Sequence, residues 1–306
     1  MSQRETGNAD SPGAQQFPPA MTAGAEEQPP APEIDITKPH VARMYDYFLG
    51  GKNNYAADRA AAEQVLKVFP LTRLGAWANR RFMIESVRWL VQEAGIRQFL
   101  DIGSGLPTQQ NVHEVAQSID KDARVVYVDN DPLVRVHAEV LLATTPNTVV
   151  LEADVRDPKA LLERPEVREH LDFSRPVGLL LVAVLHFVQD TEQAYEIVKT
   201  LCDALPSGSY LVLSHVSSDG LDESVVAHGR AAYNQASSGM FPRTKAEIAG
   251  FFTGLTPVGD GPGHVADHRL PGMPGGRGGD GDVVPVDDPA ALRKVQLMCG
   301  IARIDR

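Results

Sequence analysis

Acidic residues close three apolar runs of the sequence, and two glycines follow the first of them. The run QFLDIGSGLP carries Asp101 and then Gly103 and Gly105, whereas RVVYVD and TVVLEAD end in Asp129 and Asp154. If these runs are parallel strands, their carboxyl ends meet at one edge of a sheet, where ligands bind in open α/β folds. We therefore expect these five residues to surround one ligand.

The two glycines predict a tight loop that lets a ligand approach the backbone. Glycine adopts a positive φ without steric cost and has no Cβ to obstruct a ligand. Pro107 suits the first turn of the following helix, because its missing N–H would have no intrahelical partner there. Thr108 stands where the dinucleotide fingerprint G-x-G-x-x-G requires its third glycine, so that fingerprint is incomplete.

Asp101 favours S-adenosylmethionine over NAD as the ligand. A carboxylate is repelled by a pyrophosphate, whereas S-adenosylmethionine carries an ammonium and a sulfonium and no phosphate. Asp129 can accept the ribose hydroxyls of either molecule, and Asp154 can contact an adenine amino group. Neighbouring residues complete the predicted cofactor site: Ser104, Asn130 and Val155. The alternative for each acid alone is an ordinary polar residue at a strand end.

Two histidines are candidate catalytic bases. His186 in VAVLHFVQD and His215 in LVLSHVSSD end the fourth and fifth predicted strands, where a bound methyl group would point. Methyl transfer needs alignment and exclusion of water, and it needs a base only when the nucleophile must lose a proton. A histidine can take that proton near neutral pH. The alternative is that each ring packs beside the cofactor and bonds to nearby backbone groups.

The elements that must position these residues alternate between strands and helices. Strand-like runs are QFLDI, RVVYVD, TVVLEAD, VGLLLVAV, YLVLSHV and, after a long interruption, KVQLMCGIARI. Helix-like stretches separate the first five, which indicates βαβ units and a doubly wound, mostly parallel α/β sheet. Three helical segments precede the sheet, over KPHVARMYDYFLGG, YAADRAAAEQVLKVF and RLGAWANRRFMIESVRWLVQEAG.

Composition divides the chain into parts. Residues 1–32 hold hardly any large apolar side chain and are expected to be a disordered tail. Residues 33–95 are expected to form an N-terminal helical cap, and residues 96–306 a Rossmann-like domain that binds the cofactor. Within that domain, the glycines and prolines of residues 259–289 are too frequent for a helix or strand, which predicts a flexible loop.

Charge and hydropathy restrict the partners. The formal net charge of −11 argues against phosphate-driven binding to nucleic acid. No run of about 18 apolar residues is present, so no membrane span is expected. The start of the sequence lacks a signal-peptide pattern and only two cysteines occur, which favours a cytoplasmic location. No metal site is expected, and the oligomeric state stays open.

Motifs along the chain resemble a known family. The pattern D-x-G-x-G, an acid closing the second strand, and A-D after the third resemble class I S-adenosylmethionine-dependent methyltransferases. More specifically, HVARMYDYFLGGKNNYAADRAAAE, FLDIGSGLPTQQNVHEVAQ and VVYVDNDPLV resemble the S-adenosyl methyltransferase family common in actinomycetes. The resemblance covers about His40 to Phe252 and resumes at the last strand. The loop at 259–289 is longer and richer in glycine than the family leads us to expect.

The resemblance implies a seven-stranded sheet whose last strand, VQLMCGIARI, inserts antiparallel, with the N-terminal helices folded over the cofactor. It also implies further candidates for the cofactor or substrate cavity: Tyr45, Tyr47, Gly50, Gly51, Lys52 and Asn53. The alternative is a capped helix and a Gly-Gly turn, with the tyrosines as packing residues.

The sequence thus predicts a S-adenosylmethionine-dependent methyltransferase that acts on a small molecule. A regulatory protein that binds S-adenosylmethionine without turnover is a second possibility, because methyltransferases need no universal catalytic residue. A third, an NAD-dependent oxidoreductase, is disfavoured by Asp101 and Thr108.

Overall fold

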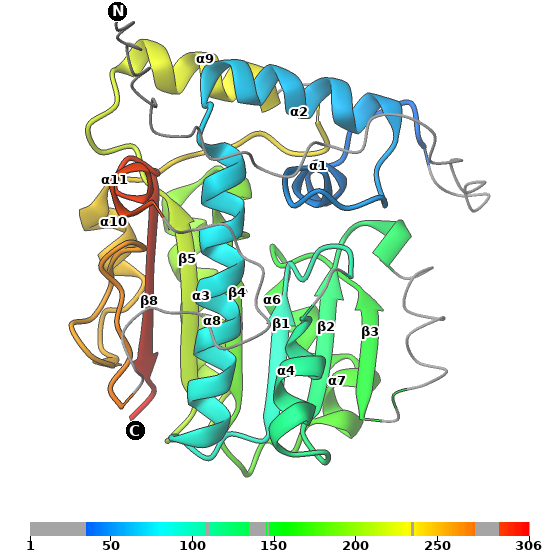
Figure 1. The fold of residues 1–306 in the computed structure, drawn as a ribbon. Helices are drawn as coiled ribbons and strands as arrows, with labels where there is room; N and C mark the ends of the chain where they lie inside the picture. The colour runs from blue at the N-terminus through cyan, green and yellow to red at the C-terminus, as the bar shows by residue number, and fades with distance from the viewer. Residues whose placement is uncertain are drawn as a thin grey trace, which may run out of the picture.

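A computed structural model describes residues 35–107, 110–134, 145, 147–233, 236–272 and 288–305 of the chain. The predicted N-terminal tail lies outside the described residues, as do Thr108 and residues 273–287 of the predicted loop. The described part is a layered α/β structure with a group of helices across one end of its sheet (Figure 1).

The sheet confirms the predicted doubly wound α/β fold. Its strands are β1 (Gln98–Ile102), β2 (Arg124–Asp129), β3 (Thr148–Glu152), β4 (Gly178–Val182), β5 (Tyr210–Val216), β6 (Thr256–Pro257), β7 (Gly263–His264) and β8 (Leu297–Arg303). The order is β3-β2-β1-β4-β5-β8-β6, with β7 also paired to β8. Strands β1 to β5 are parallel, and β8 inserts antiparallel between β5 and β6, as expected.

The described sheet has eight strands where seven were expected. The extra strand arises because β6 and β7 pair with separate parts of the same edge of β8, through Thr256 to Arg303 and Gly263 to Cys299. Gly259 and Gly261, both at positive φ, turn the chain between them. The segment predicted as a loop over residues 259–289 therefore contains a short strand and the first residue of helix α11 (Pro289–Leu292).

Helices cover both faces of the sheet because its strands are apolar on both sides. Successive residues of a strand point to opposite faces. Leu100 and Leu179 pack with α6 (Pro158–Glu163), α7 (Pro165–His170), α8 (Thr191–Asp203) and α10 (Lys245–Gly250). Phe99 and Leu180 pack with α3 (Thr72–Gln92) and α4 (Val112–Ile119), which lie in front of the sheet in Figure 1. None of the helices in the described ranges combines the length and the apolar character that crossing a bilayer requires.

The helices over the carboxyl ends of the strands are α1 (Val41–Phe48), α2 (Ala56–Val68) and α9 (Glu223–Tyr233) (Figure 1). We call these three helices the cap. They share a core of their own, in which Met44 and Val65 meet Tyr233. Helix α9 was not among the helices expected from the sequence, and α3 was expected to belong to the cap. In the structure α3 packs along the sheet through residues such as Phe82 and Val87, while its first turns reach the cap.

Candidate functional site

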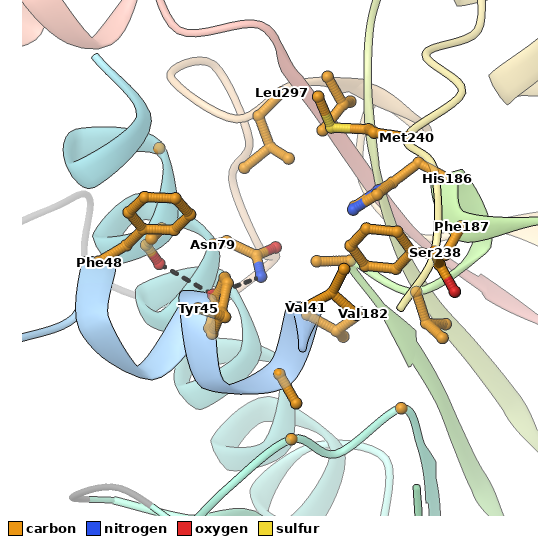
Figure 2. Close-up of a pocket in the computed structure, with 18 of the residues that line it drawn as sticks. Val41, Tyr45, Phe48, Asn79, Val182, His186, Phe187, Ser238, Met240 and Leu297 are labelled. Atoms are coloured by element: carbon orange, nitrogen blue, oxygen red, sulfur yellow. Dashed lines mark hydrogen bonds between the residues drawn. The ribbon is translucent and has the colours of Figure 1, made fainter. Parts of the chain in front are cut away.

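A cavity of about 270 Å³ lies between the carboxyl ends of the strands and the cap. Figure 2 shows two of its walls, with Val41, Tyr45 and Phe48 of α1 facing His186, Phe187 and Met240. The cavity is also lined by residues from the predicted cofactor loops: Asp101, Gly103, Ser104, Gly105, Asp129, Asn130, Asp154 and Val155. The residues at the ends of β1, β2 and β3 therefore line one cavity.

The loop after β1 is folded back onto β2. The amides of Gly103 and Ser104 both donate to the carbonyl oxygen of Val128, at 2.8 and 3.1 Å. Gly103 has φ of +74°, and a Cβ there would collide with the side chain of Val184 after β4. Gly105 also has positive φ, at +66°, but a Cβ on it would meet no atom within 4 Å. Gly103 thus lets the loop pack closely against Val184, whereas Gly105 borders empty space beside the cavity.

Asp129 organises the loop after β1. One oxygen, Oδ2, accepts a hydrogen bond from the amide of Gly105 at 2.8 Å, and Oδ1 accepts one from the amide of Asp131 at 2.9 Å. Burial raises the pKa of the Asp129 carboxyl, partly offset by these two backbone donors. A carboxylate has about four acceptor sites, so Asp129 keeps capacity for ligand hydroxyls while holding the loop.

Asp101 is buried with its charge poorly compensated. Burial raises the pKa of its carboxyl to about 7, the nearby Arg80 guanidinium opposes this rise, and the charge of Asp129 adds to it. None of the hydrogen bonds found among the described residues ends on the Asp101 carboxylate, although the residue lines the cavity. A cationic ligand group at this position would stabilise the ionised form. The observation fits the ammonium of S-adenosylmethionine.

Arg80 is a site residue that the sequence analysis missed. It projects from α3, lines the cavity, and donates from Nη2 to the side chain of Asn111 at 3.1 Å. Burial lowers its pKa, and the charge of Asp101 is among those that raise it. Arg80 and Asp101 together offer the two opposite charges that an amino-acid zwitterion requires. The only sequence signal was an arginine pair at positions 80 and 81 within a long amphipathic helix.

Asp154 lines the cavity, but its carboxylate already has a cationic partner. The Nε atom of Arg156 donates to both of its oxygens, at 2.9 and 3.0 Å. That hydrogen bonding lowers the pKa of Asp154. The predicted contact with an adenine amino group would therefore have to share this carboxylate with Arg156, which also lines the cavity.

His186 faces the cavity from the short 3₁₀ helix η1 (Leu185–Phe187). The residue is 5% exposed, and its Nδ1 atom is shielded from solvent without any hydrogen-bond partner. In Figure 2 the nitrogen-bearing end of the ring points toward the cavity. Burial, reinforced by His215 and Arg243, holds the pKa of His186 well below its ordinary value, so the imidazole is neutral.

The structure does not support His215 as a base. It is fully buried, does not line the cavity, and uses both ring nitrogens within the protein. Arg243 can only donate, so the His215 Nε2 atom accepts its hydrogen bond, at 2.9 Å, and Nδ1 donates to the carbonyl oxygen of Val216 at 2.8 Å. Burial lowers the pKa of His215 to about 3. Its lone pair is engaged, and we correct the prediction accordingly.

The partner of His215 supports η1 instead. The Arg243 guanidinium donates to the carbonyl oxygens of Leu185 and Val188, at 3.0 and 2.8 Å, on either side of His186. His215 also contacts His186 directly, with ring centroids 5.4 Å apart. This pair therefore fixes the position of the histidine that faces the cavity.

Tyr45 belongs to a hydrogen-bond chain that joins the cap to the sheet. The Asn79 amide donates to the Tyr45 hydroxyl at 2.9 Å, and that hydroxyl donates to the carbonyl oxygen of Ala76 at 3.1 Å, as the dashed lines in Figure 2 mark. The Ser214 hydroxyl of β5 donates to the other end of Asn79 at 2.5 Å. Tyr45 and Asn79 both line the cavity, which agrees with the candidate role of Tyr45.

The remaining candidates from the resemblance lie outside the cavity. The turn containing Gly50, Gly51, Lys52 and Asn53 wraps around the buried carboxylate of Asp46, which accepts hydrogen bonds from the amide of Asn53 and the side chain of Asn54. None of these turn residues lines the cavity.

Tyr47 also points away from the cavity. Its hydroxyl donates to Glu63 of α2 at 2.6 Å, and the Arg73 guanidinium lies over its ring. The structure therefore favours a packing role for Tyr47 and for the Gly-Gly turn.

Buried ion pairs attach the cap to the loop after β2. Arg43 of α1 lies with Nε 3.4 Å from Asp58 Oδ1 and 3.6 Å from Asp131 Oδ2. The ring of His40 lies 3.0 Å from Asp131. Because the amide of Asp131 donates to Asp129, the position of α1 is linked to the residue expected to bind the ribose.

Comparisons with known proteins agree with this geometry. A family model described as S-adenosyl methyltransferase matches residues 27–304. A crystal structure of a candidate methyltransferase from Thermobifida fusca YX is 41% identical, with a TM-score of 0.79, and the match covers 90% of this chain and 98% of that one. A duf574 family protein from Streptomyces avermitilis MA-4680 is 40% identical, with a TM-score of 0.77 and coverage of 87% and 97%. Both organisms are actinomycetes. No curated protein matches the chain.

Proposed function

The chain belongs to the S-adenosyl methyltransferase family, and we propose that it methylates a small molecule held in the cavity beneath its cap. Family membership makes it a S-adenosylmethionine-dependent methyltransferase. The proposal concerns the class of acceptor and the residues that hold the two molecules.

One observation carries the proposal: a single cavity has its acidic residues at the sheet end and mostly apolar side chains at the cap end. The sheet end suits a cofactor with a positive charge, a ribose and a base. The cap end, lined by residues such as Phe48, Phe69 and Met240, suits a second and less polar molecule.

The cofactor would lie across the ends of β1, β2 and β3. Asp101 would accept the ammonium and Arg80 would bind the carboxylate, while Asp129 would accept the ribose hydroxyls. The open loop at Ser104 and Gly105 would pass beside the cofactor, and the adenine would lie near a group of three residues: Asn130, Asp154 and Val155. When bound, S-adenosylmethionine supplies an electrophilic methyl group on a positively charged sulfur.

The chain itself contributes enclosure and alignment. The α1 wall and the η1 wall face each other across the cavity (Figure 2), so an acceptor between them is shielded from water and held near the methyl group. Holding two reactants in line accounts for much of the rate that an enzyme provides for such a transfer. A recessed cavity under the cap and a net charge of −11 both favour a small molecule over nucleic acid.

The test uses S-adenosylmethionine with an isotopically labelled methyl group. Purified protein is incubated with it and with a panel of small molecules, total RNA and mixed proteins, and the products are separated by mass. We expect the label in a small molecule, with an equal amount of S-adenosylhomocysteine formed, and no transfer by Asp129→Ala. Label found only in RNA or protein would overturn the proposal.

A further inference from the structure

We propose that the acceptor is an uncharged, predominantly apolar phenol whose hydroxyl donates a hydrogen bond to His186 and is methylated on oxygen. This inference rests on the proposed function, because it assigns the cap end of the same cavity to the acceptor.

Among the described residues, none that lines the cap end of the cavity carries a carboxylate. All three acids that line the cavity, Asp101, Asp129 and Asp154, follow strands β1 to β3 at the sheet end. A cationic amine at the cap end would therefore be desolvated without a counter-charge, which is strongly unfavourable. Of the described residues that line the cavity away from the sheet end, Lys294 is the only cation, and its side chain is exposed rather than buried in the wall.

The same region offers flat apolar surfaces. Phe48, Phe69 and Phe187 line it from α1, the α2–α3 connection and η1, and Tyr45 and Tyr233 add two further rings. Aromatic side chains bury large apolar areas and favour stacked or edge-on contacts with another ring. The shape and chemistry of this wall fit an aromatic acceptor better than a flexible polar one.

His186 supplies the polar contact. Its Nδ1 atom is buried and has no hydrogen-bond partner among the described residues. The nitrogen-bearing end of the ring points toward the cavity (Figure 2), so a ligand hydroxyl there can donate to the ring nitrogen that faces it. The neutral state of the ring leaves one nitrogen with an available lone pair. This contact places the nucleophilic oxygen at the end of β4.

The group-transfer step balances in charge and atoms. The phenol oxygen forms a bond to the methyl carbon, the bond from that carbon to sulfur breaks, and its electron pair stays on sulfur. The hydroxyl proton passes to the imidazole nitrogen of His186. One positive charge is buried before the step, on the sulfonium, and one after it, on the imidazolium. The proton returns to water when the products leave.

The weak basicity of His186 favours a phenol over an aliphatic alcohol. Burial and the cation of Arg243 hold the pKa of His186 well below its ordinary value, so it accepts a proton most readily from an acidic hydroxyl. Loss of the sulfonium charge during transfer increases the proton affinity of the ring, because a nearby positive charge is removed.

The test measures binding by calorimetry to protein saturated with S-adenosylhomocysteine. The probes share one ring system: 2-naphthol, 2-methoxynaphthalene, 2-naphthoate and 2-naphthylmethylammonium. We expect the wild type to bind 2-naphthol at least about tenfold more tightly than the other three, from one net hydrogen bond of about 1.4 kcal/mol. His186→Phe, which keeps an aromatic ring, and His186→Ala should both lose this preference. His228→Phe, at an exposed histidine of α9, is the matched control and should keep it.

S-adenosylhomocysteine affinity is measured for every variant, so that the two proposals can fail separately. Tight and unchanged cofactor binding without a preference for 2-naphthol would overturn the phenol assignment and leave the proposed function standing. Tighter binding of the ammonium or the carboxylate probe than of 2-naphthol would also overturn the phenol assignment. A preference that survives in both His186 variants would remove His186 from the acceptor site. Loss of S-adenosylhomocysteine binding by the wild type would instead contradict the proposed function.

Discussion

At the scale of single residues, the account depends on the unusual state of Asp101. Its carboxyl is buried, has a pKa raised to about 7, and lies beside the cavity. Such a perturbed group in a cleft marks a functional site more often than a structural one. Asp129, in contrast, has clear structural partners, and its role in binding is added to its role in holding the loop.

The first prediction concerns the pH dependence of cofactor affinity. The free protein binds a proton at Asp101 below a pH of about 7, and the ammonium of the cofactor requires the carboxylate. The affinity for S-adenosylhomocysteine should therefore fall as the pH drops below that value, by up to about tenfold per pH unit. If cofactor binding releases the Asp101 proton, the buffer takes it up. The binding enthalpy measured by calorimetry should then vary with the ionisation enthalpy of the buffer. Asp101→Asn should remove this dependence, and an unaltered profile in that variant would contradict the assignment.

The second prediction separates stability from binding at the same residue. The folded-state pKa of Asp101 is raised from 3.8 to about 7, so the folded state binds more protons than the unfolded state between these values. Stability from this group is present at low pH and is lost as the pH rises through about 7. Asp101→Asn should therefore stabilise the ligand-free protein at about pH 8, by about 2 kcal/mol, while weakening cofactor affinity roughly 30-fold. Urea denaturation of the ligand-free proteins provides the measurement, and a less stable variant at that pH would refute the argument.

At the scale of elements, α1 is attached to the sheet by charges as well as by packing. Arg43 is 4% exposed and lies between Asp58 and Asp131, whereas Lys38, five positions earlier in the chain, forms an exposed ion pair with Asp35. The buried group links α1, the start of α2 and the loop after β2. The exposed pair of Lys38 and Asp35 joins residues only three positions apart and holds no two elements together.

The third prediction follows from this difference. Arg43→Met should cost about 3–5 kcal/mol, because it removes the cation that the buried carboxylates of Asp58 and Asp131 share. Lys38→Met is the matched control and should cost less than about 1 kcal/mol, as expected for an exposed pair. Urea denaturation measures both, and S-adenosylhomocysteine affinity should fall in the first variant alone because Asp131 supports Asp129. Equal stability of the two variants would show that the buried charges do not hold the cap.

The fourth prediction concerns the turn after α1. Lys52→Ala should leave S-adenosylhomocysteine affinity within about twofold, since Lys52 is exposed and outside the cavity. Gly51→Ala should destabilise the protein by about 1–3 kcal/mol, because its Cβ would displace the Asp46 carboxylate from the amide of Asn53. Thermal unfolding measures the stability of Gly51→Ala, and calorimetry measures the affinity of Lys52→Ala for S-adenosylhomocysteine. A large loss of affinity in Lys52→Ala would return this turn to the binding site.

At the scale of the whole molecule, the alternation of strands and helices was sufficient to predict the doubly wound sheet, whereas the antiparallel last strand was expected from the family resemblance. Apolar runs buried on both faces carry a strong signal in the sequence. The two-residue strands β6 and β7 were not predictable in this way, because only their pairing with β8 distinguishes them from a loop. Helix α9 was missed because it buries only Gly229 and Tyr233, so no apolar face of regular helical spacing marks it in the sequence.

The candidate site was predictable where residues follow strands, and less so where they project from helices. Asp101 and Asp129 lie at strand ends, so the topology alone brings them together. Tyr45 and Tyr47 are two positions apart on one helix and therefore point in different directions, and only the former faces the cavity. Arg80 lies on a helix far along the chain from the loops it approaches, which no local pattern reveals.

The most direct test of the central claim is a calorimetric titration of the wild type and Asp129→Ala with S-adenosylmethionine and with NAD. The account predicts one site of about micromolar affinity for S-adenosylmethionine, weakened at least about tenfold in the variant, and no binding of NAD. Equal affinity of the two proteins for S-adenosylmethionine, or binding of NAD at the same site, would contradict the claim that the cavity at the ends of β1 and β2 holds the methyl donor.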